Sequence, residues 1–368
     1  MAMVVAVAAM AWCLAGMATL EAQSTMRPPA ALNTQYVMLV IADGVRWQEV
    51  FTGADASLMN KAGGVSDTAS LRRDFWRETP PARRAALFPF LWSTMATQGQ
   101  VFGDSAGGSP ARITNTMKFS YPGYNETFTG FADPRIDSND HPPNENTTVF
   151  EWLNRDAAFT GRVAAFATWN AFSRIFNAER SGVPVYDGWT RGVAPSESPR
   201  SVLLRDLYAT TIRVWPDVAF DALMQQSLLE YLGGHDPRVL FVGYGEPDEW
   251  AHAGKYDLYL RSARNMDAYL AQLWARVQSD PRTRDKTTMI VSTDHGRGWG
   301  REWTDHGKEV AGAEFIWTAV IGPDTPARGV RANTPVQQAQ VAATIAAWLG
   351  RDWQKAEPKA APPLPIFR

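Results

Sequence analysis

Histidine is scarce in this chain, and most of its histidines stand close to an aspartate. The sequence contains 5 histidines, and His252 follows Asp248 by four residues. On a helical turn this spacing places a carboxylate and an imidazole on one face. His295 follows Asp294 directly, and His306 lies in the Gly- and Trp-rich loop beyond them. Imidazole nitrogen and carboxylate oxygen together suit Zn²⁺, with Mn²⁺ or another divalent ion as alternatives. Taken singly, each pair also fits a surface pair or a turn.

A nucleophile candidate is found in the segment Ser-Tyr-Pro-Gly-Tyr-Asn-Glu, which begins at Ser120. We expect a short helix to start here. A hydroxyl at a helix N-terminus meets partial positive charge, which favours an alkoxide and binds phosphate oxygens. An ordinary N-cap serine has the same local pattern. The neighbouring residues therefore leave both interpretations of Ser120 open.

Apolar runs that alternate with amphipathic segments predict the elements that carry these residues. A continuous apolar run is typical of a parallel strand buried on both faces. Strands that alternate with helices predict an α/β fold with an open, mostly parallel central sheet and helices on both faces. The expected strands are residues 36–42, 163–167, 239–242 and 287–292, with 315–321 as a further candidate. The expected helices are residues 85–97, 149–154, 218–232, 256–277 and 336–349.

Aspartates follow the ends of three expected strands. Asp43 comes directly after the first strand, Asp248 shortly after residues 239–242, and Asp294 shortly after residues 287–292. In open α/β sheets, ligands bind outside the carboxyl ends of the strands. We therefore expect these three carboxylates to gather at one edge of the sheet.

Length and composition indicate a globular chain with a sizeable core. The sequence has 368 residues, of which 45% are apolar, and 36 Lys and Arg against 38 Asp and Glu give a net charge of -2. This balance carries no nucleic-acid-binding signal. Residues 131–216 are rich in Pro, Asn, Ser and Arg, so we expect a loop-rich cap insertion there. The oligomeric state is left open.

The N-terminal segment is apolar over residues 3–20 and has a small residue at Ala22. This pattern predicts a signal peptide over residues 1–22, a catalytic domain over residues 23–368 and a secreted or periplasmic location. No Lys or Arg precedes the apolar run, so retention of the segment as an anchor is the alternative. After cleavage we expect no stable membrane span. The single cysteine, Cys13, lies in this segment, so the mature chain would contain no disulfide and no Cys-ligated metal.

Taken in order, the candidate residues resemble the motifs of the alkaline phosphatase superfamily. The similarity covers roughly residues 35–325. The chain looks most like the type I phosphodiesterase/nucleotide pyrophosphatase branch and related secreted bacterial phosphatase-like proteins. The segment that runs from Ser120 to Gly130 is similar to that branch's Thr-Phe-Pro-Asn nucleophile segment, which also ends in Thr-Gly. The resemblance implies one metal site of Asp248, His252 and His306, and another of Asp43, Asp294 and His295 with Ser120 beside it.

The resemblance also implies a reaction. Two divalent ions about 4 Å apart would hold the attacking and leaving oxygens of a phosphate ester, and a phosphoseryl intermediate would form on Ser120. The substrate would be a small-molecule phosphate monoester or diester. Alternatives on the same site are sulfatase, phosphonate hydrolase or phosphosugar mutase action. A non-catalytic binding protein of this fold is a further alternative.

Other residues bear on the choice of substrate. Sulfatases of this superfamily carry Arg where this chain has Tyr124, which disfavours a sulfatase. Lys118 and Lys308 are candidate contacts for the phosphate, and Trp250, Trp299 and Trp303 flank the expected ligands. For Lys118 a solvated side chain is at least as good an interpretation, and for the tryptophans packing is favoured over a role as walls of the leaving-group pocket. One of Asn139, Asn144 and Asn146 would supply an oxyanion donor, and the spacing does not choose among them.

Overall fold

The central element is an eight-stranded sheet in the order β10-β2-β9-β7-β1-β6-β4-β5. The computed structural model describes residues 32–367, so the predicted signal peptide and Cys13 lie outside the described residues. The strands are β1 (Tyr36–Ala42), β2 (Gln100–Phe102), β4 (Val163–Ala167), β5 (Val185–Asp187), β6 (Val239–Tyr244), β7 (Thr287–Ser292), β9 (Thr318–Ile321) and β10 (Gly329–Val330). A small second sheet contains β3 (Ala111–Arg112), β8 (Phe315–Ile316) and β11 (Val336–Gln337).

The sheet is parallel at its centre. Strand β1 pairs in parallel with both β6 and β7, and β4 pairs in parallel with β6 and β5. Only β9 runs against its neighbours, β2 and β7, within residues 32–367. The predicted α/β class with a mostly parallel sheet is therefore confirmed. Each predicted ligand that follows a strand follows one of these central parallel strands.

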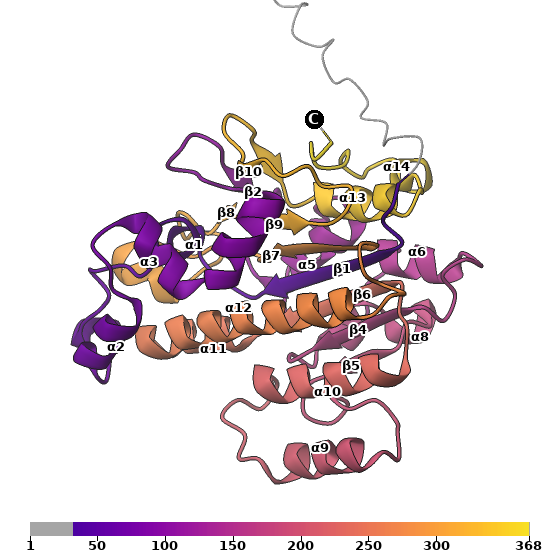
Figure 1. Cartoon of the computed structure of the whole chain (residues 1–368), viewed down its shortest axis with the longest axis horizontal. Helices are drawn as coiled ribbons and strands as arrows, with labels where there is room; N and C mark the ends of the chain where they lie inside the picture. Colours follow the sequence, from indigo (N-terminus) through magenta and orange to yellow (C-terminus); the bar gives the residue numbers. More distant parts are fainter. Residues whose placement is uncertain (1–31, 368) are drawn as a thin grey trace, which may run out of the picture.

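Strand β1 explains why the core strands read as continuous apolar runs. Its side chains alternate between two hydrophobic cores, with Met38 and Val40 in one and Val37 and Leu39 in the other. Because successive strand residues point to opposite faces, a strand covered on both faces needs apolar residues at every position. Helices α10 (Asp221–Gly234) and α12 (Tyr256–Ser279) cover the first face. Helices α5 (Ser120–Thr129), α6 (Val149–Arg155) and α13 (Gln340–Trp348) cover the second (Figure 1).

The remaining helices are short and lie around this framework. Near the N-terminal strand they are α1 (Trp47–Thr52), α2 (Thr68–Phe75), α3 (Pro80–Leu87) and α4 (Ala96–Gln98). Further along the chain they are α7 (Phe172–Ile175), α8 (Ala178–Ser181), α9 (Pro199–Thr210), α11 (Glu246–His252) and α14 (Trp353–Ala356). No helix within residues 32–367 has the length and apolar character needed to cross a membrane.

Three expected segments differ from the structure. The helix predicted over residues 85–97 is broken, because α3 ends at Leu87, two residues before Pro89, and a π-helical turn follows over Leu91–Met95. Proline disfavours helical geometry in the residue before it. The helix predicted over residues 336–349 begins only at Gln340, after β11. The strand candidate 315–321 is divided between the two sheets as β8 and β9.

Part of the expected loop-rich region 131–216 belongs to the main sheet, because β4 and β5 lie within it. The part that leaves the sheet is a smaller excursion between β5 and α10, which contains α9. Figure 1 shows α9 apart from the sheet, beyond α10. Trp189 and Tyr208 of this excursion form a small hydrophobic cluster of their own with Ala219. The excursion is thus a local extension at one edge of the sheet.

Candidate active site

Three aspartates meet at one edge of the sheet because their strands are neighbours. Strands β7, β1 and β6 are adjacent in the sheet and parallel. Asp43 follows β1, Asp294 follows β7, and Asp248 lies in α11 directly after β6. The carboxyl ends of parallel strands share an edge, so these side chains converge there. The gathering expected from the sequence is present in the structure.

The first cluster consists of Asp43, Asp294 and His295. One ligand atom from each residue lies within 4.8 Å of the others. His295 Nε2 is 3.4 Å from Asp43 Oδ1 and 3.4 Å from Asp294 Oδ2. All three side chains are buried. The three residues therefore lie together as the resemblance implied, and metal binding by them stays a prediction.

The second cluster consists of Asp248, His252 and His306. Its ligand atoms also lie within 4.8 Å of one another. His252 Nε2 is 3.2 Å from Asp248 Oδ2 and 2.9 Å from His306 Nε2. The His252 side chain is 42% exposed, so this cluster is open to solvent whereas the first is not. This grouping, too, is the one that the resemblance implied.

Two carboxylates of the first cluster are arranged so that each keeps one oxygen free. The Tyr124 hydroxyl donates to Asp43 Oδ2 at 2.9 Å, and the Gly44 backbone N–H donates to Asp294 Oδ1 at 3.2 Å. Asp43 Oδ1 and Asp294 Oδ2 are buried and have no hydrogen-bond partner among residues 32–367. A buried carboxylate oxygen without a donor is costly unless a cation binds it. These atoms fit a bound divalent ion.

The histidines are held so that one ring nitrogen of each faces the carboxylates. His295 Nδ1 lies 2.9 Å from the Gly296 carbonyl oxygen, and His306 Nδ1 lies 3.1 Å from the Lys118 carbonyl oxygen. A ring N–H that donates to a carbonyl leaves Nε2 with its lone pair, as a metal ligand requires. Lys118 has a left-handed φ of 54°, which turns its carbonyl toward His306.

The charges of the clusters also favour a cation. Burial, together with the charges of Asp294 and Asp248, raises the pKa of Asp43 well above its usual value. Burial and the charge of Asp248 raise the pKa of Asp294 to about 7. Burial lowers the pKa of His306 to about 2, so this imidazole is neutral. Crowded carboxylates beside imidazole nitrogens are the donor set that a divalent ion of the zinc type binds.

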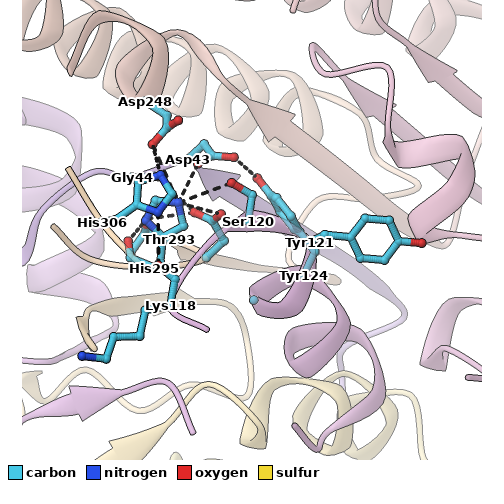
Figure 2. Close-up of polar contacts among 12 residues, drawn as sticks. Asp43, Gly44, Lys118, Ser120, Tyr121, Tyr124, Asp248, Thr293, His295 and His306 are labelled. Carbon is cyan, nitrogen blue, oxygen red and sulfur yellow. Dashed lines mark hydrogen bonds and ion pairs between the residues drawn. The ribbon is translucent and has the colours of Figure 1, made fainter. Parts of the chain in front are cut away.

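Ser120 is the first residue of α5 and faces the first cluster. Its Oγ lies 3.4 Å from His295 Nε2 (Figure 2). The helix approaches the end of β7 closely at Gly123, where an added Cβ would lie 2.5 Å from the Asp294 carbonyl oxygen. Any larger residue there would move α5 away. The Pro-Gly pair after the candidate nucleophile therefore lets Ser120 reach the carboxylates.

A cavity of about 670 Å³ opens in front of Ser120. It continues past the clusters along the carboxyl ends of β4 and β5, where Trp169 and Arg191 line it. The cavity is predominantly polar in its lining. The other residues that line it are Asp43, Asn139, Asp140, Asn170, Arg174, Thr190, Asp217, Val218, Gly245, Asp248, Glu249, His252 and His306.

The structure separates the three asparagines that the sequence left as alternatives. Asn139 lines the cavity, and its Oδ1 accepts a hydrogen bond from the Tyr121 backbone N–H at 2.9 Å. This arrangement leaves the Asn139 amide N–H groups as donors next to Ser120. Asn144 and Asn146 instead donate to Asn125 Oδ1. Asn139 is thus the asparagine in place to contact a substrate.

The lysine candidates lie elsewhere. Lys118 Nζ forms an ion pair with Glu314 at 3.3 Å, and Figure 2 shows the Lys118 side chain directed away from Ser120. Lys308 is exposed on the surface. Two of the tryptophans that flank the ligands pack within the protein: Trp303 is buried against Tyr256, and Trp250 packs against Trp215. The packing interpretation of these two tryptophans is confirmed. The third, Trp299, is 48% exposed, although its ring contacts Trp47 edge-on.

The sequence matches no family model and no curated protein. Its structure is nevertheless similar to solved structures. A protein in the alkaline phosphatase superfamily from Vibrio parahaemolyticus matches with a TM-score of 0.52 at 12% identity, covering 89% of this chain and 69% of that one. The chain therefore shares the α/β fold of this superfamily protein.

Two further solved structures share this superfamily fold. A phosphonate monoester hydrolase from Silicibacter pomeroyi has a TM-score of 0.52 at 13% identity, covering 89% of this chain and 78% of that one. A 2-O GAG sulfatase has a TM-score of 0.51 at 10% identity, covering 88% and 73%. At such identities the likeness concerns the fold, so the substrate has to be argued from the residues of this chain.

Sequence reasoning missed Arg297, which lies three residues after Asp294. Its side chain is fully buried and forms an ion pair with Asp248 Oδ1. It also donates to the carbonyl oxygens of Asp248, at 3.1 Å, and Thr304, at 2.7 Å. Although burial opposes it, the charge of Arg297 helps to hold the pKa of Asp248 well below its usual value. The only available signal was an Arg directly after Asp-His-Gly, and its partner is distant in sequence.

Proposed function

We propose that this chain is a two-metal hydrolase of phosphate esters that uses Ser120 as its nucleophile. The observation that carries the proposal is that Ser120 and both clusters open onto one cavity. Asp43, His252 and His306 line the same cavity as Ser120. Attacking and leaving oxygens can therefore lie next to the two candidate metal positions at once. Two divalent ions, when bound, would lower the pKa of the Ser120 hydroxyl and neutralise the charge of both oxygens.

Side chains of the chain would position the reacting groups and donate hydrogen bonds to the phosphate. Ser120 Oγ would form a bond to phosphorus as the bond to the leaving-group oxygen breaks, giving a phosphoseryl intermediate and an alcohol. Water would then hydrolyse the phosphoserine to release phosphate. Asn139, whose amide oxygen is held by the Tyr121 backbone N–H, would donate to a non-bridging oxygen. Ser120 at the start of the ten-residue helix α5 also meets the positive end of the helix dipole.

Tyr124 supports phosphate over sulfate as the substrate. The sulfatase motif requires an arginine four residues after the modified residue, and this position holds Tyr124. The Tyr124 hydroxyl is already committed to Asp43 Oδ2. An arginine at this position would place a buried cation beside Asp43, so the surroundings of Asp43 in this chain differ from those expected for the sulfatase motif.

The test is the Ser120→Ala variant of the metal-loaded protein. We expect turnover of p-nitrophenyl phosphate and bis-p-nitrophenyl phosphate to fall at least about 1,000-fold, while the metal content stays the same. The Ser93→Ala variant, at an exposed serine, serves as the matched control. Unchanged turnover in Ser120→Ala would refute the proposal. Faster turnover of p-nitrophenyl sulfate or a phosphonate monoester by the wild type would instead support one of the sister chemistries.

We also propose that the chain is secreted or periplasmic, as a catalytic domain over residues 23–368. The apolar run at residues 3–20 and the small residue at Ala22 support this proposal. N-terminal sequencing of the protein from an extracytoplasmic fraction would identify the cleavage site. An N-terminus at Met1 in that material would contradict cleavage.

A further inference from the structure

Arg297 introduces a fixed positive charge beside Asp248 of the second cluster. Its guanidinium is completely buried and forms an ion pair with Asp248 Oδ1. It stands against Gly44 as well, since a Cβ added at Gly44 would lie 2.8 Å from Arg297 Nε and 2.6 Å from Asp248 Oδ1. A guanidinium does not lose its proton in proteins. The positive charge is therefore present under all working conditions.

This charge makes the two clusters electrostatically different. The first cluster contains two carboxylates, Asp43 and Asp294, and no cationic side chain bonds to either of them among the described residues. The second cluster contains one carboxylate, Asp248, whose charge is matched by Arg297. When both clusters bind an ion through ionised carboxylates, the first cluster supplies two negative charges to its ion, whereas the second supplies one, which Arg297 offsets.

Geometry and solvent access reinforce the difference. Arg297 forms its ion pair with Asp248 Oδ1, which lies 3.8 Å from His306 Nε2, and the other oxygen, Oδ2, lies 3.2 Å from His252 Nε2. His252 is 42% exposed, whereas the Asp294 side chain is fully buried. Glu249 lines the same cavity but is outside the group of ligand atoms. The second cluster thus has fewer carboxylate oxygens to offer an ion and is open to solvent at His252.

From these observations we infer that the two metal positions are unequal because of Arg297. The Asp43, Asp294 and His295 cluster binds its ion tightly, and the Asp248, His252 and His306 cluster binds its ion weakly and exchanges it with solvent. The inference rests on the proposed two-metal function. The second cluster has no net negative charge of its own to hold an ion. A phosphate ester in the cavity would supply that charge, so substrate binding strengthens the binding of the second ion.

The first experiment is a titration of the metal-stripped full chain with Zn²⁺ in the presence of a competing chromophoric chelator. We expect two binding events per chain whose dissociation constants differ by at least about 100-fold. Adding inorganic phosphate should strengthen the weaker event and leave the stronger one unchanged. Two events of equal affinity would overturn the inference alone. Absence of Zn²⁺ binding would overturn both the inference and the proposed function.

The second experiment separates the charge of Arg297 from its role in holding Asp248. Arg297→Gln removes the charge and keeps an amide donor, whereas Arg297→Lys keeps the charge. We expect Arg297→Gln to tighten the weaker event at least about tenfold and Arg297→Lys to leave it close to the wild type. If both variants weaken the event equally, Arg297 only positions Asp248 and the inference fails.

Variants of a buried arginine can fail to fold, so each is checked by thermal unfolding before the titration. The wild-type titration needs no substitution and decides the inequality by itself. In either variant, the tighter event should keep its wild-type affinity, because Asp43 and Asp294 do not contact Arg297 through an ion pair. An equal loss of Zn²⁺ affinity at both positions would indicate that the substitution distorts the whole site. It would count against the role assigned to the charge of Arg297.

Discussion

The Tyr124 hydroxyl donates a hydrogen bond of 2.9 Å to Asp43 Oδ2, and both side chains are buried. Ser120 and Tyr124 are four residues apart on α5 and therefore lie on one face of this helix. One helix thus presents the candidate nucleophile and also orients a candidate metal ligand. The bond leaves Asp43 Oδ1 as the oxygen that faces His295, 3.4 Å away.

Removal of this hydroxyl should weaken metal binding. In Tyr124→Phe we expect the affinity for Zn²⁺ at the tighter position to fall about 10- to 100-fold, because partners that orient a ligand contribute on this scale. Competition with a chelator measures it. Tyr121→Phe is the matched control, since Tyr121 is also buried on α5 but donates to the Pro142 carbonyl oxygen. Equal losses in both variants would show that the effect is not specific to Asp43.

Gly44 should tolerate no side chain. It has a φ of +61°, and an added Cβ would meet Asp248 and Arg297. We expect Gly44→Ala to destabilise the protein by about 2–4 kcal/mol and to impair the Asp248 cluster. Gly161→Ala is the control, because Gly161 has a φ of +71° and nothing lies within 4 Å of its added Cβ. Urea unfolding compares the two, and an equal loss would mean that backbone strain alone is responsible.

Asp267, which lies outside the candidate active site, should make the stability of the protein depend on pH. Burial raises its pKa to about 6, although the backbone N–H groups of Phe90 and Leu91 donate to its carboxylate. The unfolded chain has a lower pKa of about 4, so between these values the folded state binds more protons. The contribution of Asp267 to stability is present below about pH 4 and is lost as the pH rises through about 6.

The measurement compares the wild type with Asp267→Asn, which does not titrate. The free energy of unfolding of the wild type should fall relative to the variant by about 3 kcal/mol between about pH 4 and about pH 7. Parallel pH profiles of the two proteins would contradict the raised pKa. The comparison uses the change with pH, so a constant difference from the lost hydrogen bond does not affect it.

The sequence alone determined the centre of the fold, and its resemblance to a known superfamily predicted how the candidate ligands are grouped. The run at 36–42 predicted β1 because a strand buried on both faces needs an apolar residue at every position. Asp43 and Asp294 could be expected at one edge because they follow strands of the predicted parallel sheet. The break in the helix predicted over residues 85–97 was not foreseen. That segment is amphipathic throughout, but its first helix ends at Leu87, two residues before a Pro.

Only the tertiary structure decided which side chains surround the ligands. Arg297 reaches Asp248, Tyr124 reaches Asp43, and Asn139 rather than its neighbours lies beside Ser120. A strand or helix imposes a periodicity that can be read along the chain, because it depends on residues a few positions apart. A hydrogen bond between distant segments depends on how whole elements pack, and no local pattern records that distance.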